Sequence, residues 1–307
     1  MKRHIRVAAA QIGGIQLEET RESVIDRMIV LLERAAVSGC QLIVFPELTL
    51  TTFFPRYWFD DEKDVDAFFE TSMPGRETER LFERARELNI GFYLGYAERA
   101  DDRRFNTSIL VEQDGTQVGK YRKIHLPGHS EHKPTAPFQH LEKRYFEVGD
   151  LGFGVWPAFD AKIGMCICND RRWPETFRVM ALQGAEMAVL GFNTPTVNIF
   201  HDEPPHLRMF HHFISMQAAA YQNGLWIVAS AKSGYEDGFR LHGGTCIIAP
   251  TGEVVAQTLT EDDELITYDC DLSMGEYIKN SVFNFRAHRR IDEYRLITER
   301  TAPDDNF

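Results

Sequence analysis

The feature that most constrains the fold is a strand that leads through a turn into a helix, within residues 162–182. Apolar residues alternate with other residues from 162 to 167, and this period of two predicts a strand. Pro174 has no place inside a sheet but suits the first turn of a helix. Cys168 therefore stands where the strand ends, beside backbone N–H groups that can face a ligand. A single cysteine there is more often a packed small hydrophobe than a nucleophile, so catalysis requires reactive partners.

Strands and helices alternate along the rest of the chain, and some strands are joined as hairpins. The first fifty residues predict a strand, a helix and a strand, at 6–12, 18–37 and 41–45. Further strands are expected at 91–96, 107–111, 117–124, 186–190, 225–231, 245–249, 253–257 and 265–271. Further helices are expected at 62–69, 77–88 and 206–223. This order predicts an α/β fold in which helices cover mixed sheets.

Two segments and the tail add detail to this plan. Residues 127–149 form a long, poorly patterned segment whose aromatic side chains favour a functional loop. The helix at 206–223 is expected to bury an apolar face made of Phe210, Phe213, Ile214, Ala218 and Tyr221. No repeat or linker divides the chain, so we expect one domain over residues 1–307. Its core is expected at about 1–272, and the charged extension at 273–307 is expected at a subunit interface.

Composition and charge exclude several classes of partner. The formal net charge of −12 argues against nucleic acid or an anionic membrane as the main partner. Without a run of 18 apolar residues or a signal-peptide core, we expect a cytoplasmic protein. The five cysteines and the histidines at 201–212 follow no disulfide or metal-ligand spacing, so no metal site is expected.

Three reactive side chains each stand at the carboxyl end of a predicted strand, the edge where α/β folds collect their chemistry. A cysteine nucleophile such as Cys168 needs a base, which Glu47 can supply. A developing oxyanion needs a cation or N–H donor, which Lys123 can supply. Each also has a plain alternative: a helix-capping glutamate, a solvated lysine, and a cysteine that packs in the core or forms a redox pair with Cys166. Their joint occurrence favours a catalytic site.

The segments around these side chains resemble the signatures of the nitrilase superfamily of carbon–nitrogen hydrolases. Together with a fourth segment at 138–147 they are similar to the N-carbamoyl-D-amino-acid amidohydrolases of that superfamily: FPELTLTTFFPR (45–56), KYRKIHLPGH (120–129), FQHLEKRYFE (138–147) and CNDRRWPE (168–175). Residues 130–136 depart from that pattern. The resemblance implies a nitrilase-like four-layer α-β-β-α sandwich with two mixed sheets. It also implies a homodimer or homotetramer assembled through helices, with neither metal nor organic cofactor.

The resemblance assigns roles to individual residues. In the family the nucleophile is followed by one residue and then an acidic residue, which selects Cys168 over Cys166. By the same matching Glu47 is the general base, Lys123 stabilises the tetrahedral intermediate and Glu142 is an assisting second glutamate. The residues expected around the substrate are His125, His140, Asn169, Arg171, Arg172, Asn193 and Thr194.

These residues together predict a hydrolase that removes the carbamoyl group from N-carbamoyl-D-amino acids through a thioester on Cys168. A guanidinium suits the carboxylate of such a substrate. The family carries an arginine at the position of Arg172 whatever the substrate, so Arg171 is expected to be the distinctive carboxylate partner. The alternatives are another amidase of the superfamily, acting on a β-ureido acid or an ω-amide, a metallohydrolase, and a non-catalytic binding protein of the same fold.

Overall fold

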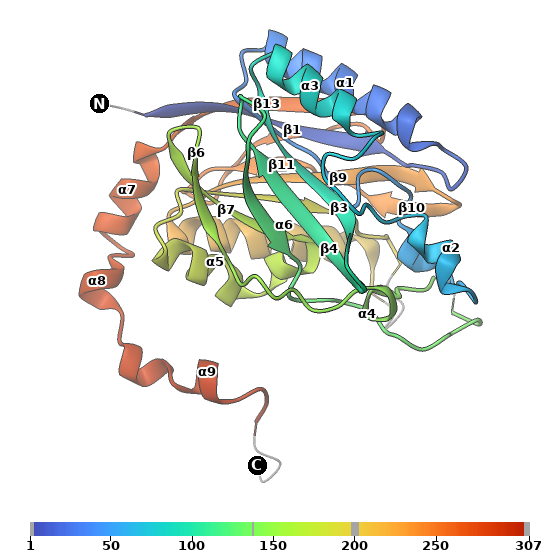
Figure 1. The fold of residues 1–307 in the computed structure, drawn as a ribbon. Helices are drawn as coiled ribbons and strands as arrows, with labels where there is room; N and C mark the ends of the chain where they lie inside the picture. Colours follow the sequence, from blue (N-terminus) through green and yellow to red (C-terminus); the bar gives the residue numbers. More distant parts are fainter. Residues whose placement is uncertain (1–2, 137, 198–202, 304–307) are drawn as a thin grey trace.

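The computed structural model describes residues 3–136, 138–197 and 203–303. Two mixed sheets pack face to face in it (Figure 1). In spatial order, the first sheet contains β13 (Glu264–Asp271), β1 (His4–Gly13), β2 (Leu42–Val44), β3 (Gly91–Ala100), β4 (Arg103–Val111) and β5 (Gln117–Arg122). The second contains β12 (Val254–Gln257), β11 (Cys246–Ile248), β9 (Trp226–Glu236), β8 (Met187–Phe192), β7 (Ala161–Ile167) and β6 (Val155–Ala158).

Each sheet has a parallel centre, β1-β2-β3 in the first and β9-β8-β7 in the second, with antiparallel strands outside it. The sheets join at one corner, where the end of β1 pairs with β9 and Ile12 lies beside Lys232. The short β10 (Phe239–His242) folds back on β9 at the same corner. The carboxyl ends of the parallel strands of both sheets therefore lie near one another.

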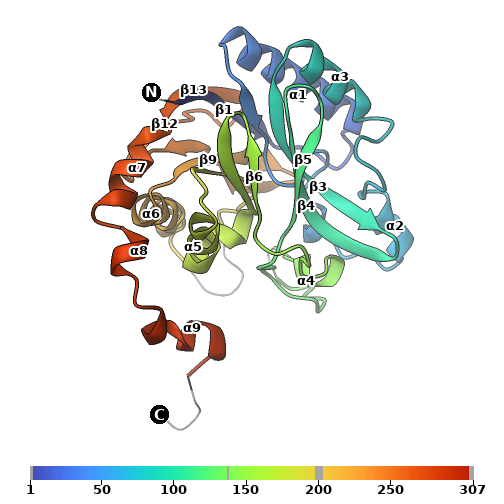
Figure 2. The same cartoon turned by 60° about the vertical axis from the view of Figure 1, so that its left-hand side comes forward.

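Helices cover the outer face of each sheet (Figures 1 and 2). On the first sheet lie α1 (Arg21–Val37) and α3 (Glu79–Glu87), whose apolar faces share a buried core with β1, β2 and β3. On the second lie α5 (Pro174–Leu182) and α6 (Pro205–Asn223). Thr20 caps the start of α1 by accepting the N–H of Ser23, and Gly224 ends α6 in a left-handed conformation. The predicted four-layer sandwich is confirmed.

The space between the two sheets is filled by side chains from both. Within β7, every residue from Ile163 to Ile167 is buried, because the other sheet covers one face and α5 the other. A tyrosine crosses this layer: Tyr93 on β3 donates its hydroxyl to the carbonyl oxygen of Cys166 (3.0 Å) and accepts the N–H of Gly191 (3.1 Å). One side chain of the first sheet thus binds two neighbouring strands of the second.

The predicted inward face of α6 is wrong at three of its five residues, whereas Phe213 packs against the core and Ala218 is half-buried. Phe210, Ile214 and Tyr221 are 57%, 47% and 42% exposed. The buried positions of the helix include His212, Met216, Ala219 and Ala220. Apolar residues occupy several sides of α6, and the two alanines let the helix approach the sheet closely, so the larger side chains turn outward. Periodicity alone could not decide between these faces.

The loops and the tail complete the chain. The segment after β2 contains η1 (Phe54–Arg56) and α2 (Glu62–Asp66), which is shorter than predicted. The 127–149 segment contains α4 (Glu142–Tyr145), and η2 (Cys168–Arg172) joins β7 to α5. The tail consists of α7 (Ser273–Asn280), α8 (Phe285–His288), η3 (Ile291–Tyr294) and α9 (Leu296–Glu299), and it leaves the body of the sandwich (Figure 2).

None of the helices in the described part of the chain is both long and apolar enough to cross a lipid bilayer.

Candidate active site

The turn after β7 gives Cys168 its position. Its φ angle is +46°, a value that is uncommon outside glycine, so this residue does not continue the extended strand. The buried carboxylate of Asp170 holds the turn, accepting the N–H of Ile167 (3.0 Å) and the hydroxyl of Tyr121 (2.7 Å). Cys166 remains in the extended strand between the sheets. The two cysteines therefore do not share one strand face, and Cys168 lines a cavity of about 330 Å³.

Glu47 lies at the carboxyl end of β2 and is fully buried. Its Oε1 accepts hydrogen bonds from Asn106 Nδ2 (2.8 Å) and from Lys123 Nζ (2.7 Å). Its Oε2 accepts the backbone N–H of Asn193 (3.0 Å). Three donors, one within β4 and the others just after β5 and β8, thus fix the carboxylate. The alternative of an exposed helix cap does not fit this position.

Lys123 lies between two carboxylates. Its Nζ is 2.7 Å from Glu47 Oε1 and 2.6 Å from Glu142 Oε2, and all three side chains are buried. Burial alone would lower the pKa of this lysine, but Cys168 and the two carboxylates hold it above its ordinary value. The lysine is therefore a fixed buried cation, and the alternative of a solvated surface charge does not fit.

Glu142 is held in its charged form. Although burial alone would raise its pKa, the cation of Lys123 and a contact with His140 lower it below its ordinary value. His140 Nε2 lies 2.9 Å from Glu142 Oε1. Two carboxylates and one lysine thus form a buried cluster of net negative charge next to the thiol.

The thiol of Cys168 is protonated at rest. Burial and the charge of Glu47 raise its pKa to about 11, and Lys123 and Arg171 oppose this effect. Its Sγ lies 3.6 Å from the carbonyl oxygen of Asn193. Because a thiol with this pKa carries almost no thiolate at neutral pH, it requires a base to become a nucleophile. Glu47 lies close enough to influence the thiol and can serve as that base.

Arg171 is buried behind the cysteine. NH1 donates to the carbonyl oxygen of Cys168 (2.7 Å), NH2 to Thr194 Oγ1 (3.1 Å) and Nε to His212 Nδ1 (3.3 Å). The guanidinium also stacks over the ring of Phe192, 4.4 Å from its centroid. Each of its three nitrogens is therefore bound within the protein.

Arg172 differs from Arg171 in its exposure and in its contacts. Its side chain is exposed at a cavity of about 330 Å³ that also holds Cys168. Among the described residues it forms no hydrogen bond or ion pair. Of the two adjacent arginines, Arg172 is thus the one available to a ligand.

The remaining predicted residues fall into two groups. Asn169, His140, Asn193 and Thr194 line the cavity. His125 does not: its Nδ1 lies 2.8 Å from Asp170 Oδ1, and its ring stacks on Trp173. The expected place of His125 beside the substrate is therefore not supported, and its contacts give it a part in holding the turn of Cys168.

Sequence reasoning missed several residues of this region. Asn106 binds Glu47, His212 binds Arg171, and Asp170 organises the turn. Glu203 and Arg208 form part of the cavity wall. Asp170 had a sequence signal, because it follows the nucleophile by two positions. The others contact the site from distant positions, such as Glu47 to Asn106 across 59 residues, and no local pattern marks them.

A buried ion network lies behind the loop that carries Glu47. Glu236 accepts hydrogen bonds from Lys232 Nζ (2.8 Å) and from the N–H of Phe53 (2.8 Å), and it also pairs with Arg56. Lys232 donates in turn to the carbonyl oxygen of Thr51 (2.9 Å). These contacts fix residues 51–56 to the end of β9.

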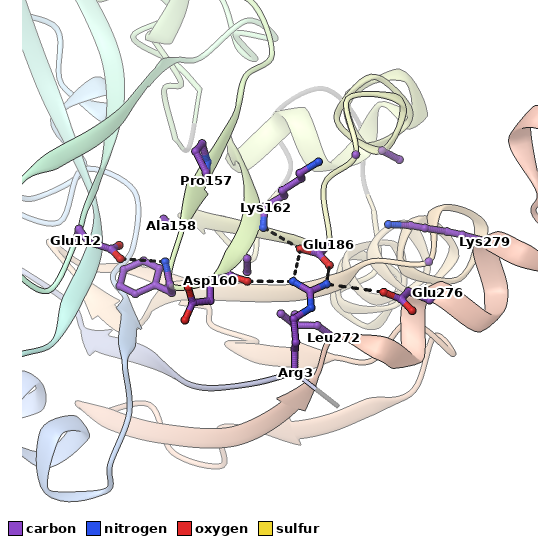
Figure 3. A pocket seen from close by; sticks show the side chains of 15 residues that line it. Arg3, Glu112, Pro157, Ala158, Asp160, Lys162, Glu186, Leu272, Glu276 and Lys279 are labelled. Atoms are coloured by element: carbon purple, nitrogen blue, oxygen red, sulfur yellow. Dashed lines mark hydrogen bonds and ion pairs between the residues drawn. The ribbon is translucent and has the colours of Figure 1, made fainter. Parts of the chain in front are cut away.

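A larger cavity, of about 700 Å³, lies at the amino ends of β7 and β8, away from the strand ends that carry the cluster (Figure 3). Among its charged residues, Arg3 pairs with Glu186 and Glu276. No cysteine lines it. Size alone therefore does not identify the reactive cavity.

No group of three or more histidine, cysteine, aspartate or glutamate side chains in the described ranges is placed to hold a metal ion. His211 contacts Glu203, and His212 contacts Arg171 and Gly244. His201, also considered at the sequence level, lies outside the described residues.

Comparison with known proteins identifies the family. Residues 6–280 match the model of the carbon-nitrogen hydrolase family. A nitrilase of Pyrococcus abyssi is 31% identical over 290 residues, 94% of this chain and 98% of that protein. An N-carbamoylputrescine amidase of Arabidopsis thaliana is 31% identical over 96% of each chain, and a citrullinase of Francisella tularensis is 29% identical over 87% of this chain and 89% of its own. A carbon-nitrogen hydrolase structure from Helicobacter pylori covers 98% of this chain and all of its own, with a TM-score of 0.84 and 24% identity.

The chain therefore belongs to the carbon–nitrogen hydrolase family of the nitrilase superfamily, as the four segments predicted. Within that family it is a hydrolase of non-peptide carbon–nitrogen bonds in amides or carbamoyl compounds.

Proposed function

We propose that this enzyme hydrolyses N-carbamoyl-D-amino acids to the D-amino acid, carbon dioxide and ammonia. The observation that carries the proposal is the free guanidinium of Arg172 in the cavity of Cys168. An N-carbamoyl amino acid has a carboxylate two bonds from the ureido nitrogen, and arginine binds a carboxylate through two parallel hydrogen bonds. The D configuration follows from the resemblance of the four segments to that group of amidohydrolases.

The proposed reaction uses the buried cluster in two stages. Sγ of Cys168 attacks the carbamoyl carbon while Glu47 takes the thiol proton, and Lys123 stabilises the charge that develops on the oxygen. Collapse of this intermediate breaks the bond to the terminal nitrogen, which leaves as ammonia with the proton from Glu47. Water activated by Glu47 then hydrolyses the thioester. The carbamate so formed decomposes to carbon dioxide and the free amino acid.

The contacts of the two arginines favour Arg172, in place of Arg171, as the carboxylate partner. Arg171 would have to break bonds to Cys168, Thr194 or His212 to meet a substrate. We assign it instead to holding the turn of the nucleophile. Glu142, in contact with Lys123, is assigned to keeping that lysine charged and in place.

The charge of the cavity separates this proposal from the activities named for two relatives. N-carbamoylputrescine carries an ammonium group and no carboxylate. Arg171, Arg172 and Arg208 all line the cavity and would repel that ammonium group. Citrulline has a carboxylate, but three bonds further from its ureido nitrogen. A β-ureido acid or an ω-amide would place the carboxylate at still other distances.

A substrate panel tests the proposal. N-carbamoyl-D- and L-amino acids, a β-ureido acid, citrulline, N-carbamoylputrescine and a simple amide are compared by ammonia release, with and without a chelator. We expect the highest kcat/KM for N-carbamoyl-D-amino acids, unchanged by chelation. A higher kcat/KM for N-carbamoylputrescine or citrulline would reject the proposed substrate, and loss of activity on chelation would favour a metallohydrolase.

We also propose that the enzyme is a homodimer or homotetramer. Large apolar side chains are exposed on α5, on α6 and along the 273–307 extension, including Leu182, Phe210, Ile214, Tyr277 and Ile297. A second copy would remove this apolar surface from water. Light scattering on the full chain and on Phe210→Asp measures the mass directly. A monomeric wild-type chain at micromolar concentration would reject this assembly.

A further inference from the structure

The wall of the reactive cavity carries more positive charge than an N-carbamoyl amino acid with a neutral side chain can use. Arg171, Arg172 and Arg208 line it, and Glu203 is the one carboxylate among the described residues of that wall. One substrate carboxylate at Arg172 would still leave Arg208 with one carboxylate partner, Glu203, which it shares with His211. An incompletely paired guanidinium in a partly enclosed site is costly, so the wall is suited to a second anionic group.

Arg208 is the residue with unused hydrogen-bonding capacity. It lies in the first turns of α6, and its side chain is 11% exposed. Its NH1 donates to Glu203 Oε2 (3.1 Å), but its buried Nε has no hydrogen-bond partner among the described residues. Buried donors in proteins are nearly always satisfied, so an unsatisfied guanidinium nitrogen beside a cavity points to a missing acceptor.

Glu203 does not fully neutralise this arginine, because it is shared. Its Oε1 lies 2.8 Å from His211 Nδ1, while its Oε2 accepts from Arg208. Burial, together with the charge of Arg171, lowers the pKa of Arg208 although Glu203 opposes the shift. Partial burial, then the charge of Arg171 and then that of Arg208 lower the pKa of Arg172. The guanidinium groups therefore repel one another across this wall, and an added carboxylate would relieve that repulsion.

We propose that the cavity selects N-carbamoyl amino acids whose side chain ends in a carboxylate, and that Arg208 binds this second carboxylate. This inference rests on the proposed function, in which Arg172 binds the α-carboxylate. In a carbamoylated aspartic or glutamic acid, Arg172 then binds the α-carboxylate and Arg208 binds the side-chain carboxylate. Arg208 is a specificity residue, remote from the bond that is broken.

Matched acid and amide substrates test this assignment. N-carbamoyl-D-aspartate is compared with N-carbamoyl-D-asparagine, and the glutamate with the glutamine derivative, because each pair differs in charge and hardly in shape. For the wild type we expect kcat/KM to be at least about tenfold higher for the acid, the size of one charge-assisted hydrogen bond or more. In Arg208→Gln the value for the acid should fall by about ten- to a hundredfold and that for the amide by less than about threefold.

A second variant should change the acid-to-amide ratio of kcat/KM in the opposite direction. Glu203→Gln removes the competing carboxylate, so the acid-to-amide ratio should rise above that of the wild type. Arg84→Gln is the matched control for Arg208→Gln: Arg84 lies on α3 and pairs with Glu33 and Glu87, so its loss changes the net charge by the same amount as the loss of Arg208, without touching the cavity. It should leave the ratio unchanged.

The outcomes are distinguishable. A wild type that prefers the amides, or an Arg208→Gln variant that loses the same factor on both members of a pair, overturns the acidic specificity. So does a ratio that falls in Glu203→Gln. If no N-carbamoyl α-amino acid is hydrolysed at all, the proposed function fails, and this inference fails with it.

Discussion

The guanidinium of Arg171 touches Cys168 at two atoms: NH1 lies 2.7 Å from its carbonyl oxygen and 3.7 Å from its Sγ. The first contact fixes the turn, and the second places a positive charge beside the thiol. An arginine expected to hold the substrate thus serves the nucleophile.

This contact predicts different effects for the two adjacent arginines. In Arg171→Met the pKa of the Cys168 thiol should rise further above about 11, because a stabilising charge is lost. We expect kcat to fall at least about tenfold for substrates with and without a carboxylate. Iodoacetamide alkylation across pH measures the thiol directly. In Arg172→Met the loss should appear as a raised KM for substrates that carry the carboxylate. The reverse pattern would restore Arg171 as the carboxylate partner.

The choice of nucleophile is tested by two cysteine variants. Cys168→Ala should abolish ammonia release while its melting temperature stays close to that of the wild type, because the side chain lines a cavity. Cys166→Ala removes a buried sulfur between the sheets and should cost about 1 kcal/mol or more of stability yet retain activity. An inactive Cys166→Ala that is folded, beside an active Cys168→Ala, would reverse the assignment.

Removing the buried lysine should affect stability as well as catalysis. Lys123→Met leaves Glu47 and Glu142 without their shared cation, which should cost about 3–5 kcal/mol of stability. kcat should fall by at least about a thousandfold. The double variant Lys123→Met with Glu142→Gln should recover part of the stability and none of the activity. Denaturant unfolding of Lys123→Met, Glu142→Gln and the double variant measures the coupling, and strictly additive losses would show that the cluster is not one unit.

The lowered pKa of Glu142 predicts how the stability of the fold changes in acid. Its folded-state pKa is lowered, mainly by Lys123 against the effect of burial, so it binds protons more weakly when folded than when unfolded. Its stabilising contribution is present above the unfolded value of about 4.3 and is lost as pH falls through the lower folded value. The melting temperature of Glu142→Gln should therefore fall less between pH 5 and pH 3 than that of the wild type. Glu175→Gln, at an exposed carboxyl, is the control and should follow the wild type.

Much of the fold could be predicted because local sequence patterns mark its strands, turns and helices. The strand, the turn and Pro174 placed Cys168 correctly at the end of β7. The inward face of α6 could not be predicted, since its apolar residues point in several directions and only the neighbouring layer selects among them. The join of β1 to β9 likewise depends on two segments more than 200 residues apart.

Within the site, the sequence identified which residues approach one another but not what each one binds. Lys123 meets Glu47 across 76 positions, and no local rule reveals that it is buried between two carboxylates. The difference between Arg171 and Arg172 is set by His212 and Thr194, which come from α6 and from the end of β8. The sequence shows which residues are charged, but it does not show which groups each of them contacts.

The hydroxyl of Tyr93 has a consequence for catalysis at a distance. Glu47 and Lys123 extend from one sheet, and Cys168 from the other. The alignment of base and nucleophile therefore depends on the relative position of the two sheets. The hydroxyl of Tyr93 joins the two sheets through its hydrogen bonds to Cys166 on β7, the strand that leads to Cys168, and to Gly191 on β8. Tyr93→Phe should therefore behave as a misaligned enzyme within an intact sandwich, and its turnover should decay at denaturant concentrations where its circular dichroism is still native.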